Sequence, residues 1–271
     1  MGNGVVFLCY NSSVKILLTN DDGIEAPGLT ALWTALREEH ECLVVAPASE
    51  KSASSHSISL GQKLVIEERG PRQFAVYGTP ADCVKFALSE IKDFRPDLLV
   101  AGINPGPNTG VSVYYSGTIS AAREGLINRI PGMAISIASR TPTSFSFAAS
   151  FAALLLEGYE EGIFPPGILL NVNLPPFPEA EIRGVKIARQ ASSRFVEEFI
   201  KESSNGHRRV YRLAGEIEIF DPDGTTDEEV LAQGYIVMTP LQLDVTDYSA
   251  MPLLENWMKE KEATWLAPKN I

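Results

Sequence analysis

Two adjacent carboxylates, Asp21 and Asp22, stand directly after an apolar, strand-like run at Lys15–Thr19. Neighbouring carboxylates repel each other, and burial at the end of a strand makes them costly unless a cation neutralises them. Their oxygens are hard ligands that suit Mg²⁺ or Mn²⁺ better than a soft metal, and Gly23 permits the tight turn that the pair needs. The alternative is an Asx-turn that leads into a helix cap. We interpret the pair as metal ligands.

Two further loops follow strand-like runs and contain possible ligands. The hydroxyl-rich segment 49–57 includes Ser52 and His56, and its composition alone is more typical of a flexible loop with a surface histidine. The segment 102–110 is rich in Gly, Pro and Asn. It contributes Asn104, whose amide oxygen would be a hard, neutral ligand. A plain turn is the alternative for this second loop.

A fourth loop, Tyr115–Thr118, opens a helix. Backbone N–H groups and the helix dipole at such a position favour an anion, and the hydroxyls of Ser116 and Thr118 add donors. An ordinary serine N-cap is the alternative. The coincidence of four such loops indicates a site that holds a metal ion and a small phosphate ester together.

Continuous apolar runs alternate with helical patterns over the first two-thirds of the chain. The expected strands are 15–19, 42–46, 64–67, 74–77, 98–103, 133–138 and 168–174, and the expected helices are 26–39, one capped by Thr79, 116–128 and 144–159. Such alternation predicts an α/β fold with a mostly parallel sheet covered on both faces. Ligands of these sheets bind outside the carboxyl ends of the strands, where the four loops fall.

The pattern changes after about residue 190. The chain is polar over 192–209, alternates like a hairpin strand over 210–220, and ends with a strand at 235–239 and a helix at 253–261. We expect three segments: a disordered lead-in at 1–13, an α/β catalytic core at 14–190, and a C-terminal extension at 191–271 that forms an oligomerisation arm.

The composition excludes several classes of function. Of 271 residues, 45% are hydrophobic and 21% charged, with a net charge of −11. An acidic chain without a Lys/Arg run is a poor candidate for binding nucleic-acid polymers or membrane surfaces, and no apolar run approaches the roughly 20 residues that span a bilayer. Three cysteines in no zinc-binding pattern favour a reducing, cytoplasmic compartment. P-loop, dinucleotide-binding and G-x-S-x-G motifs are absent from the sequence.

Taken together, the ordered motifs resemble the SurE family, the survival-protein-E nucleotidases. The resemblance rests on Lys15–Ile24, Val45–Pro47 with Ser52 and Ser55–Ser57, Gly78–Val84, Gly102–Asn108 and Tyr115–Thr118, with a weaker match at Gly234–Asp247. It runs from about residue 14 to 190. Pro105 occupies a variable position of the family, Tyr115 stands where some relatives carry His, and 192–209 is poorly matched.

The resemblance implies a three-layer, Rossmann-like fold and hydrolysis of nucleoside 5′- and 3′-monophosphates with one divalent metal ion per subunit, Mg²⁺ or Mn²⁺. It places metal ligands at Asp21, Asp22, Ser52 and Asn104, and phosphate contacts at Asn108, Ser116, Gly117 and Thr118. It also implies a homodimer or homotetramer whose C-terminal arm is exchanged between subunits.

Several alternatives stay open. Asp21 or Asp22 could act as a base towards water or as a direct nucleophile. A haloacid-dehalogenase-like aspartyl phosphatase would want Asp-x-Asp after the first strand, whereas here the pair is adjacent and followed by Gly23. A non-enzymatic nucleotide or metal sensor with an oligomeric arm is an alternative of another class.

Overall fold

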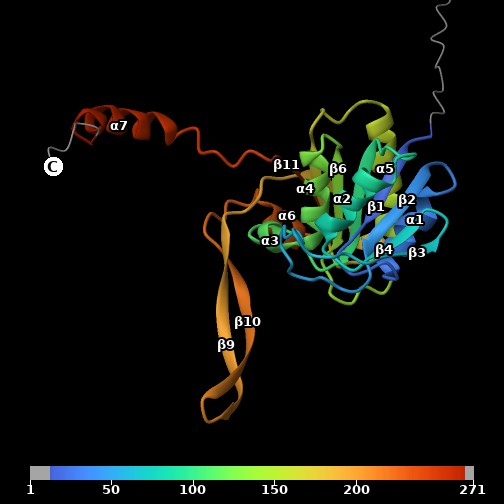
Figure 1. Cartoon of the computed structure of the whole chain (residues 1–271), viewed down its shortest axis with the longest axis horizontal. Helices are drawn as coiled ribbons and strands as arrows, with labels where there is room; N and C mark the ends of the chain where they lie inside the picture. Colours follow the sequence, from blue (N-terminus) through green and yellow to red (C-terminus); the bar gives the residue numbers. More distant parts are fainter. Residues whose placement is uncertain (1–12, 266–271) are drawn as a thin grey trace, which may run out of the picture. The chain divides into compact units, whose positions relative to one another are not determined.

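A nine-stranded sheet organises the chain in the computed structural model, which describes residues 13–265 (Figure 1). The strand order is β3-β4-β2-β1-β5-β6-β7-β11-β8. The chain divides into one compact unit that ends at Leu241 and a second that begins at Gln242. Of the lead-in expected at 1–13, all but Ser13 lies outside the described residues, as does Cys9.

Most neighbouring strands of the sheet are parallel, as the continuous apolar runs predict. The strands are β1 (Lys15–Thr19), β2 (Glu41–Pro47), β3 (Ile66–Gly70), β4 (Gln73–Val76), β5 (Leu98–Pro105), β6 (Gly132–Ile137), β7 (Leu169–Leu174), β8 (Val185–Ile187) and β11 (Ile236–Leu241). The pairs β3/β4 and β7/β11 are antiparallel, and the remaining six pairs are parallel. The central strands are buried on both faces, which explains their unbroken apolar sequences.

Helices cover both faces of this sheet and complete three layers (Figure 1). They are α1 (Pro27–Leu36), α2 (Pro80–Glu90), α4 (Gly117–Ile127) and α5 (Ser146–Glu160). Alternate residues of β1 point to opposite faces: Ile16 packs in the cluster with α1 and α5, and Leu17 in the cluster with α2 and α4. The predicted cap of α2 is present, since Thr79 and Asp82 form a capping box. The three-layer α/β prediction is confirmed.

The C-terminal part of the chain adds two features to the sequence expectation. The polar segment 192–209 contains a long strand, β9 (Ser193–Asn205), which pairs with β10 (Arg208–Ile219) in a separate antiparallel hairpin. The expected hairpin arm is therefore present, and its first strand lies in the polar segment, whose exposed residues show no continuous apolar run.

The second feature concerns the main sheet, and the last helix lies where it was expected. Strand β11 joins the main sheet, where Val230, Leu231 and Val237 form a small core with Ala188. The helix α6 (Asp227–Ala232) supplies the first two of these residues. The last helix, α7 (Met251–Trp265), belongs to the second unit. Among the described helices, none is long and apolar enough to cross a membrane.

Candidate functional site

The acidic pair lies at the topological switch point of the sheet. Strand β1 has β2 on one side, reached through α1, and β5 on the other. Open α/β sheets bind their ligands at the carboxyl ends of such a strand pair. Asp21 and Asp22 follow β1, and Asn104 lies at the carboxyl end of β5, beyond the paired residues Thr19 and Ala101. The predicted ligands of these two strands therefore share one edge of the sheet.

Asp21 is buried against the first turn of α4. The hydroxyl of Thr118 donates to Asp21 Oδ1. A Cβ added to Gly117 would lie 2.6 Å from Asp21 Cβ, so only glycine fits there. Burial raises the pKa of Asp21, and hydrogen bonds from Thr118 and from nearby backbone N–H groups offset the rise only in part. Asp21 thus sits where a cation would stabilise its charge.

The negative charge of Asp22 has even less stabilisation from its surroundings than that of Asp21. Burial, then the charges of Asp21 and Glu50, raise the pKa of Asp22 to about 7. Its Oδ2 is buried without a hydrogen-bond partner among the described residues. The Asx-turn alternative is in fact formed by Asn20, which exchanges two hydrogen bonds with the backbone of Gly23. Both carboxylates are therefore free of the turn and available to a ligand.

The hydroxyl-rich loop is attached to this acidic pair. Lys51 N donates to the carbonyl oxygen of Asp21 over 2.7 Å, and Ser55 N donates to the carbonyl of Tyr115 over 3.1 Å. Ser52 is exposed, and its hydroxyl donates to Glu50 Oε1 over 2.5 Å. Because that bond uses the hydroxyl hydrogen, the lone pairs of Ser52 Oγ remain available to a cation.

Asn104 shows the same arrangement. Its Nδ2 donates to the carbonyl oxygen of Gly106 over 2.7 Å, which leaves Oδ1 as the free ligand atom. Within the described residues there is no group of three His, Cys, Asp or Glu side chains placed to hold a metal. A cation at this edge would hence need neutral oxygens, such as those of Ser52 and Asn104, besides the two carboxylates.

The residues predicted to contact phosphate differ in how many of their hydrogen-bonding groups are already used within the protein. Ser116 caps α4, since its Oγ accepts from Ile119 N over 3.1 Å. The hydroxyl of Thr118 is bound to Asp21 and faces the acidic pair. Asn108 donates through its backbone N–H to Asn173 and through Nδ2 to Ser136. One of the two Nδ2 hydrogens of Asn108 is therefore left without a partner among the described residues, and its contact with phosphate stays a prediction.

Sequence reasoning missed a cluster of polar side chains around a buried carboxylate beside the site. Glu124 of α4 is only 2% exposed, and it binds His56 Nε2 over 2.9 Å and Lys85 Nζ over 2.7 Å. Burial acts to raise the pKa of Glu124, but the hydrogen bonds from His56 and Lys85 hold that pKa below its usual value. The expectation of a surface histidine was wrong. A buried acid within the apolar run of α4 is the one signal that could have suggested a partner.

Comparisons with known proteins agree with this geometry. A family model described as Survival protein SurE matches residues 16–197. A protein named 5′-nucleotidase SurE from Desulfatibacillum aliphaticivorans is 43% identical, covering 92% of this chain and 100% of that protein. A protein of the same name from Moorella thermoacetica is 45% identical, covering 86% of this chain and 92% of that protein.

A solved structure is similar over almost the same length. The crystal structure of the SurE protein from Aquifex aeolicus is 35% identical, with a TM-score of 0.78 over 90% of this chain and 99% of that one. The range matched by the family model contains every residue predicted for the site, from Asp21 to Thr118.

Proposed function

Because the chain belongs to the SurE family, we propose that it is a metal-dependent phosphatase that hydrolyses nucleoside 5′-monophosphates, and also 3′-monophosphates, to nucleoside and phosphate. The observation that carries the proposal is the buried, unpartnered Asp22 Oδ2 beside the carboxylate of Asp21 at the switch point of the sheet. The names of the relatives support the substrate class. Free thiols at Cys42 and Cys83 support a cytoplasmic location.

The donor set suits one Mg²⁺ or Mn²⁺ ion. Asp21, Asp22, Ser52 and Asn104 would hold it through four hard oxygens, two of them charged. When bound, the ion would polarise a phosphoryl oxygen and lower the pKa of a bound water. The pKa values of Asp21 and Asp22 are raised because no cation offsets their burial and mutual repulsion, and a bound metal ion would lower both values.

The remaining groups would bind and orient the phosphate. Ser116 would donate its hydroxyl hydrogen to the phosphate, since its Oγ is the acceptor in the cap of α4. The backbone N–H groups of Gly117 and Thr118, which also favour the ionised Asp21, would be shared between that carboxylate and the phosphate. Donors fixed in a helix stabilise charge on the equatorial oxygens without reorganising. Asp21 or Asp22 would act either as a base towards water or as a nucleophile that attacks the phosphorus. The haloacid-dehalogenase-like alternative requires the nucleophile.

A phosphate-release assay over nucleoside monophosphates, with Mg²⁺, Mn²⁺ or EDTA, tests the proposal. Turnover that requires the metal and is lost in Asp22→Asn supports it. Binding of nucleotide without turnover under every metal would contradict it and favour the sensor. Trapping a phospho-enzyme on Asp21 or Asp22 would identify the nucleophile and favour the aspartyl-phosphatase alternative.

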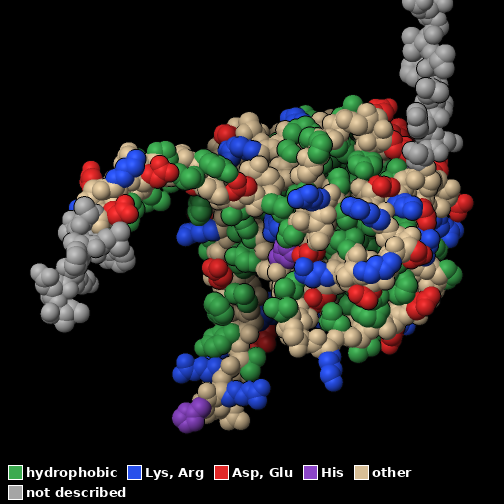
Figure 2. Space-filling model, turned by 45° about the horizontal axis from the view of Figure 1, so that its top comes forward, with side chains coloured by type: hydrophobic (Ala, Val, Ile, Leu, Met, Phe, Trp, Pro, Cys, Tyr) green, Lys and Arg blue, Asp and Glu red, His purple; other side chains and the backbone are tan. Residues whose placement is uncertain are grey.

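We also propose a homodimer or homotetramer built through the C-terminal arm. The β9–β10 hairpin exposes large apolar side chains, and Figure 2 shows hydrophobic groups along it. They include Val196, Phe199, Tyr211, Leu213 and Ile217. An isolated two-stranded hairpin is marginally stable in water, so a partner that covers this face would stabilise it. The exposed Leu253, Leu254 and Trp257 of α7 support the same role for the second unit.

A further inference from the structure

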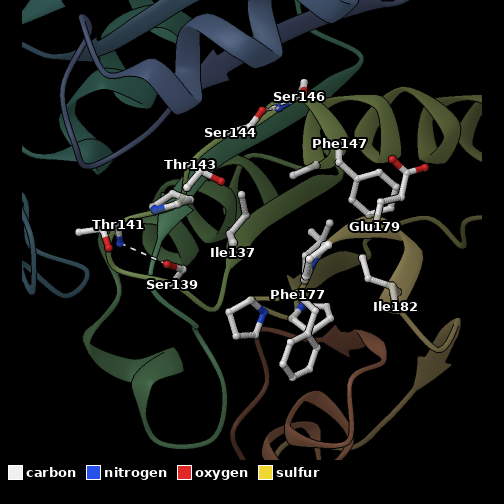
Figure 3. Close-up of a pocket in the computed structure, with 16 residues that line it drawn as sticks. Ile137, Ser139, Thr141, Thr143, Ser144, Ser146, Phe147, Phe177, Glu179 and Ile182 are labelled. Atoms are coloured by element: carbon white, nitrogen blue, oxygen red, sulfur yellow. Dashed lines mark hydrogen bonds between the residues drawn. The ribbon is translucent and has the colours of Figure 1, made fainter.

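A pocket of about 370 Å³ opens at the carboxyl ends of β6 and β7 (Figure 3). Its walls are the loop and helix start that follow β6, at 137–148, and the segment 174–182 that follows β7. The volume lies within the range of small-molecule sites. None of the residues assigned above to metal or phosphate lines it.

The pocket adjoins the predicted phosphate loop through two strand ends. Ser136 of β6 accepts a hydrogen bond from Asn108 Nδ2, and Asn173 of β7 accepts one from Asn108 N. The next residues along these strands, Ile137 and Leu174, line the pocket. Gly106 N also donates to the carbonyl oxygen of Ile137 over 2.8 Å. Strands β6 and β7 stand two and three places from β1, a lateral span of roughly 10–14 Å. A nucleotide can bridge such a span.

The lining combines two kinds of surface. Phe147, Ile182 and the prolines after β7 form an apolar wall, which suits the faces of a base. Hydroxyl groups stand opposite in the loop after β6 (Figure 3), and they suit a ribose and the polar edge of a base. They belong to Ser139, Thr141, Thr143, Ser144 and Ser146.

The charge of the lining decides which part of a ligand it accepts. Among the described residues that line the pocket, none is Lys or Arg, and Glu179 is acidic. A second phosphate or a polyphosphate chain would meet no counter-charge there. An uncharged, flat and hydroxylated group would meet suitable partners over most of the surface.

We propose that this pocket binds the nucleoside moiety of the substrate while the acidic pair and α4 bind its phosphate. The inference rests on the proposed function. It makes the loop after β6 a determinant of the preference for nucleoside phosphates over other phosphate esters.

The test compares Ser146→Leu with Ser150→Leu. Both residues are exposed in α5 and one turn apart, but only Ser146 lines the pocket. With Mn²⁺, the ratio of kcat/KM for 5′-AMP to that for ribose 5-phosphate should fall about tenfold in Ser146→Leu and stay unchanged in Ser150→Leu. Thr143→Leu, in the exposed loop, should act like Ser146→Leu. An unchanged ratio in both pocket variants would overturn the inference.

Calorimetric titration with adenosine separates the pocket from the phosphatase activity. Adenosine should bind the wild-type protein and Ser150→Leu, and bind Ser146→Leu about tenfold more weakly. Absent binding in the wild type, or equal binding in all three, would overturn the pocket even if the enzyme cleaves 5′-AMP. Failure to release phosphate from either ester would refute the proposed function instead, and the adenosine result would still decide the pocket.

Discussion

The hydroxyl of Thr118 donates a hydrogen bond to Oδ1 of Asp21 over 2.5 Å. Thr118 lies in the first turn of α4 and is fully buried, so the helix fixes its side chain. The preceding residue, Gly117, has no side chain because Asp21 fills that space. The helix predicted to hold phosphate therefore also orients the predicted metal ligand, and a disturbance of one half of the site must reach the other.

Thr118→Val should weaken metal binding. Valine keeps the shape of threonine but leaves Asp21 without its side-chain donor, which raises the pKa of Asp21 further. Loss of a group that orients a ligand typically lowers metal affinity about 10- to 100-fold. Titration with Mn²⁺ measures this effect, and Thr118→Ser should restore the affinity. An unchanged Mn²⁺ affinity with a raised KM would mean that the hydroxyl serves the phosphate alone.

Asp22→Asn should nearly abolish turnover and yet stabilise the metal-free protein. The substitution removes a charge that burial, Asp21 and Glu50 all disfavour. Solvent screens part of this repulsion because Asp22 is only partly buried, so the gain should be on the order of 1 kcal/mol. Phosphate release and thermal unfolding in EDTA measure the two effects. Wild-type turnover, or a lower melting temperature in EDTA, would refute the assignment.

The same carboxylates predict an unusual dependence of stability on pH. The pKa of Asp22 is about 7 in the folded protein, against the ordinary value of 3.8 for an aspartate, so the folded state binds more protons across that interval. Stability without metal should therefore fall as pH rises from about 4 to 7. Asp22→Asn should reduce this fall, because it removes one of the groups with a raised pKa.

Saturating Mn²⁺ should oppose the loss of stability with rising pH, since a bound cation favours the ionised carboxylates. Melting temperatures measured from pH 5 to 8, in EDTA and in Mn²⁺, check both expectations. A wild-type protein and an Asp22→Asn variant with equal pH dependence in EDTA would contradict them.

The central layers of the fold follow from the sequence because their cause is local. Strands such as β1 and β6 are buried on both faces, and unbroken apolar runs are the direct result. Strand β9 of the hairpin gave no such signal, since it is exposed and pairs only with β10 among the described strands. The short β8 and α6 depend on tertiary pairing, which propensity does not encode.

In the candidate site, too, some residues can be predicted from the local sequence and others depend on the tertiary fold. Asp21 and Asp22 can be predicted because residue type and position after a strand suffice. The bond between Thr118 and Asp21 joins residues 97 positions apart, and that between His56 and Glu124 spans 68. Neither pairing has a periodic pattern in the sequence. Both arise only because the fold brings the loops after β1 and β2 to the same helix, α4.

His56→Ala should destabilise the protein and loosen the loop that contains Ser52. Removal of the imidazole leaves a buried carboxylate at Glu124 with one hydrogen-bond partner fewer, at a cost of about 1–3 kcal/mol. Because His56 joins that loop to α4, Mn²⁺ affinity should fall as well. Denaturant unfolding and Mn²⁺ titration measure the two effects.

The conservative variant His56→Gln serves as its control. A glutamine amide can still donate to Glu124, so it should restore most of both quantities. Destabilisation without any change in Mn²⁺ affinity would show that the cluster around Glu124 is structural only.

Phe199→Glu should weaken self-association without unfolding the core. Phe199 is 66% exposed on β9 and touches Tyr211 across the hairpin, with ring centroids 6.5 Å apart. A large aromatic side chain in this position is a typical interface anchor, and loss of such an anchor costs about 2 kcal/mol or more of association energy. Ser203→Glu, also exposed on β9, makes the same charge change without removing an apolar group. Sedimentation should show smaller assemblies for Phe199→Glu than for Ser203→Glu, and equal assembly of both variants would exclude the hairpin as the subunit interface.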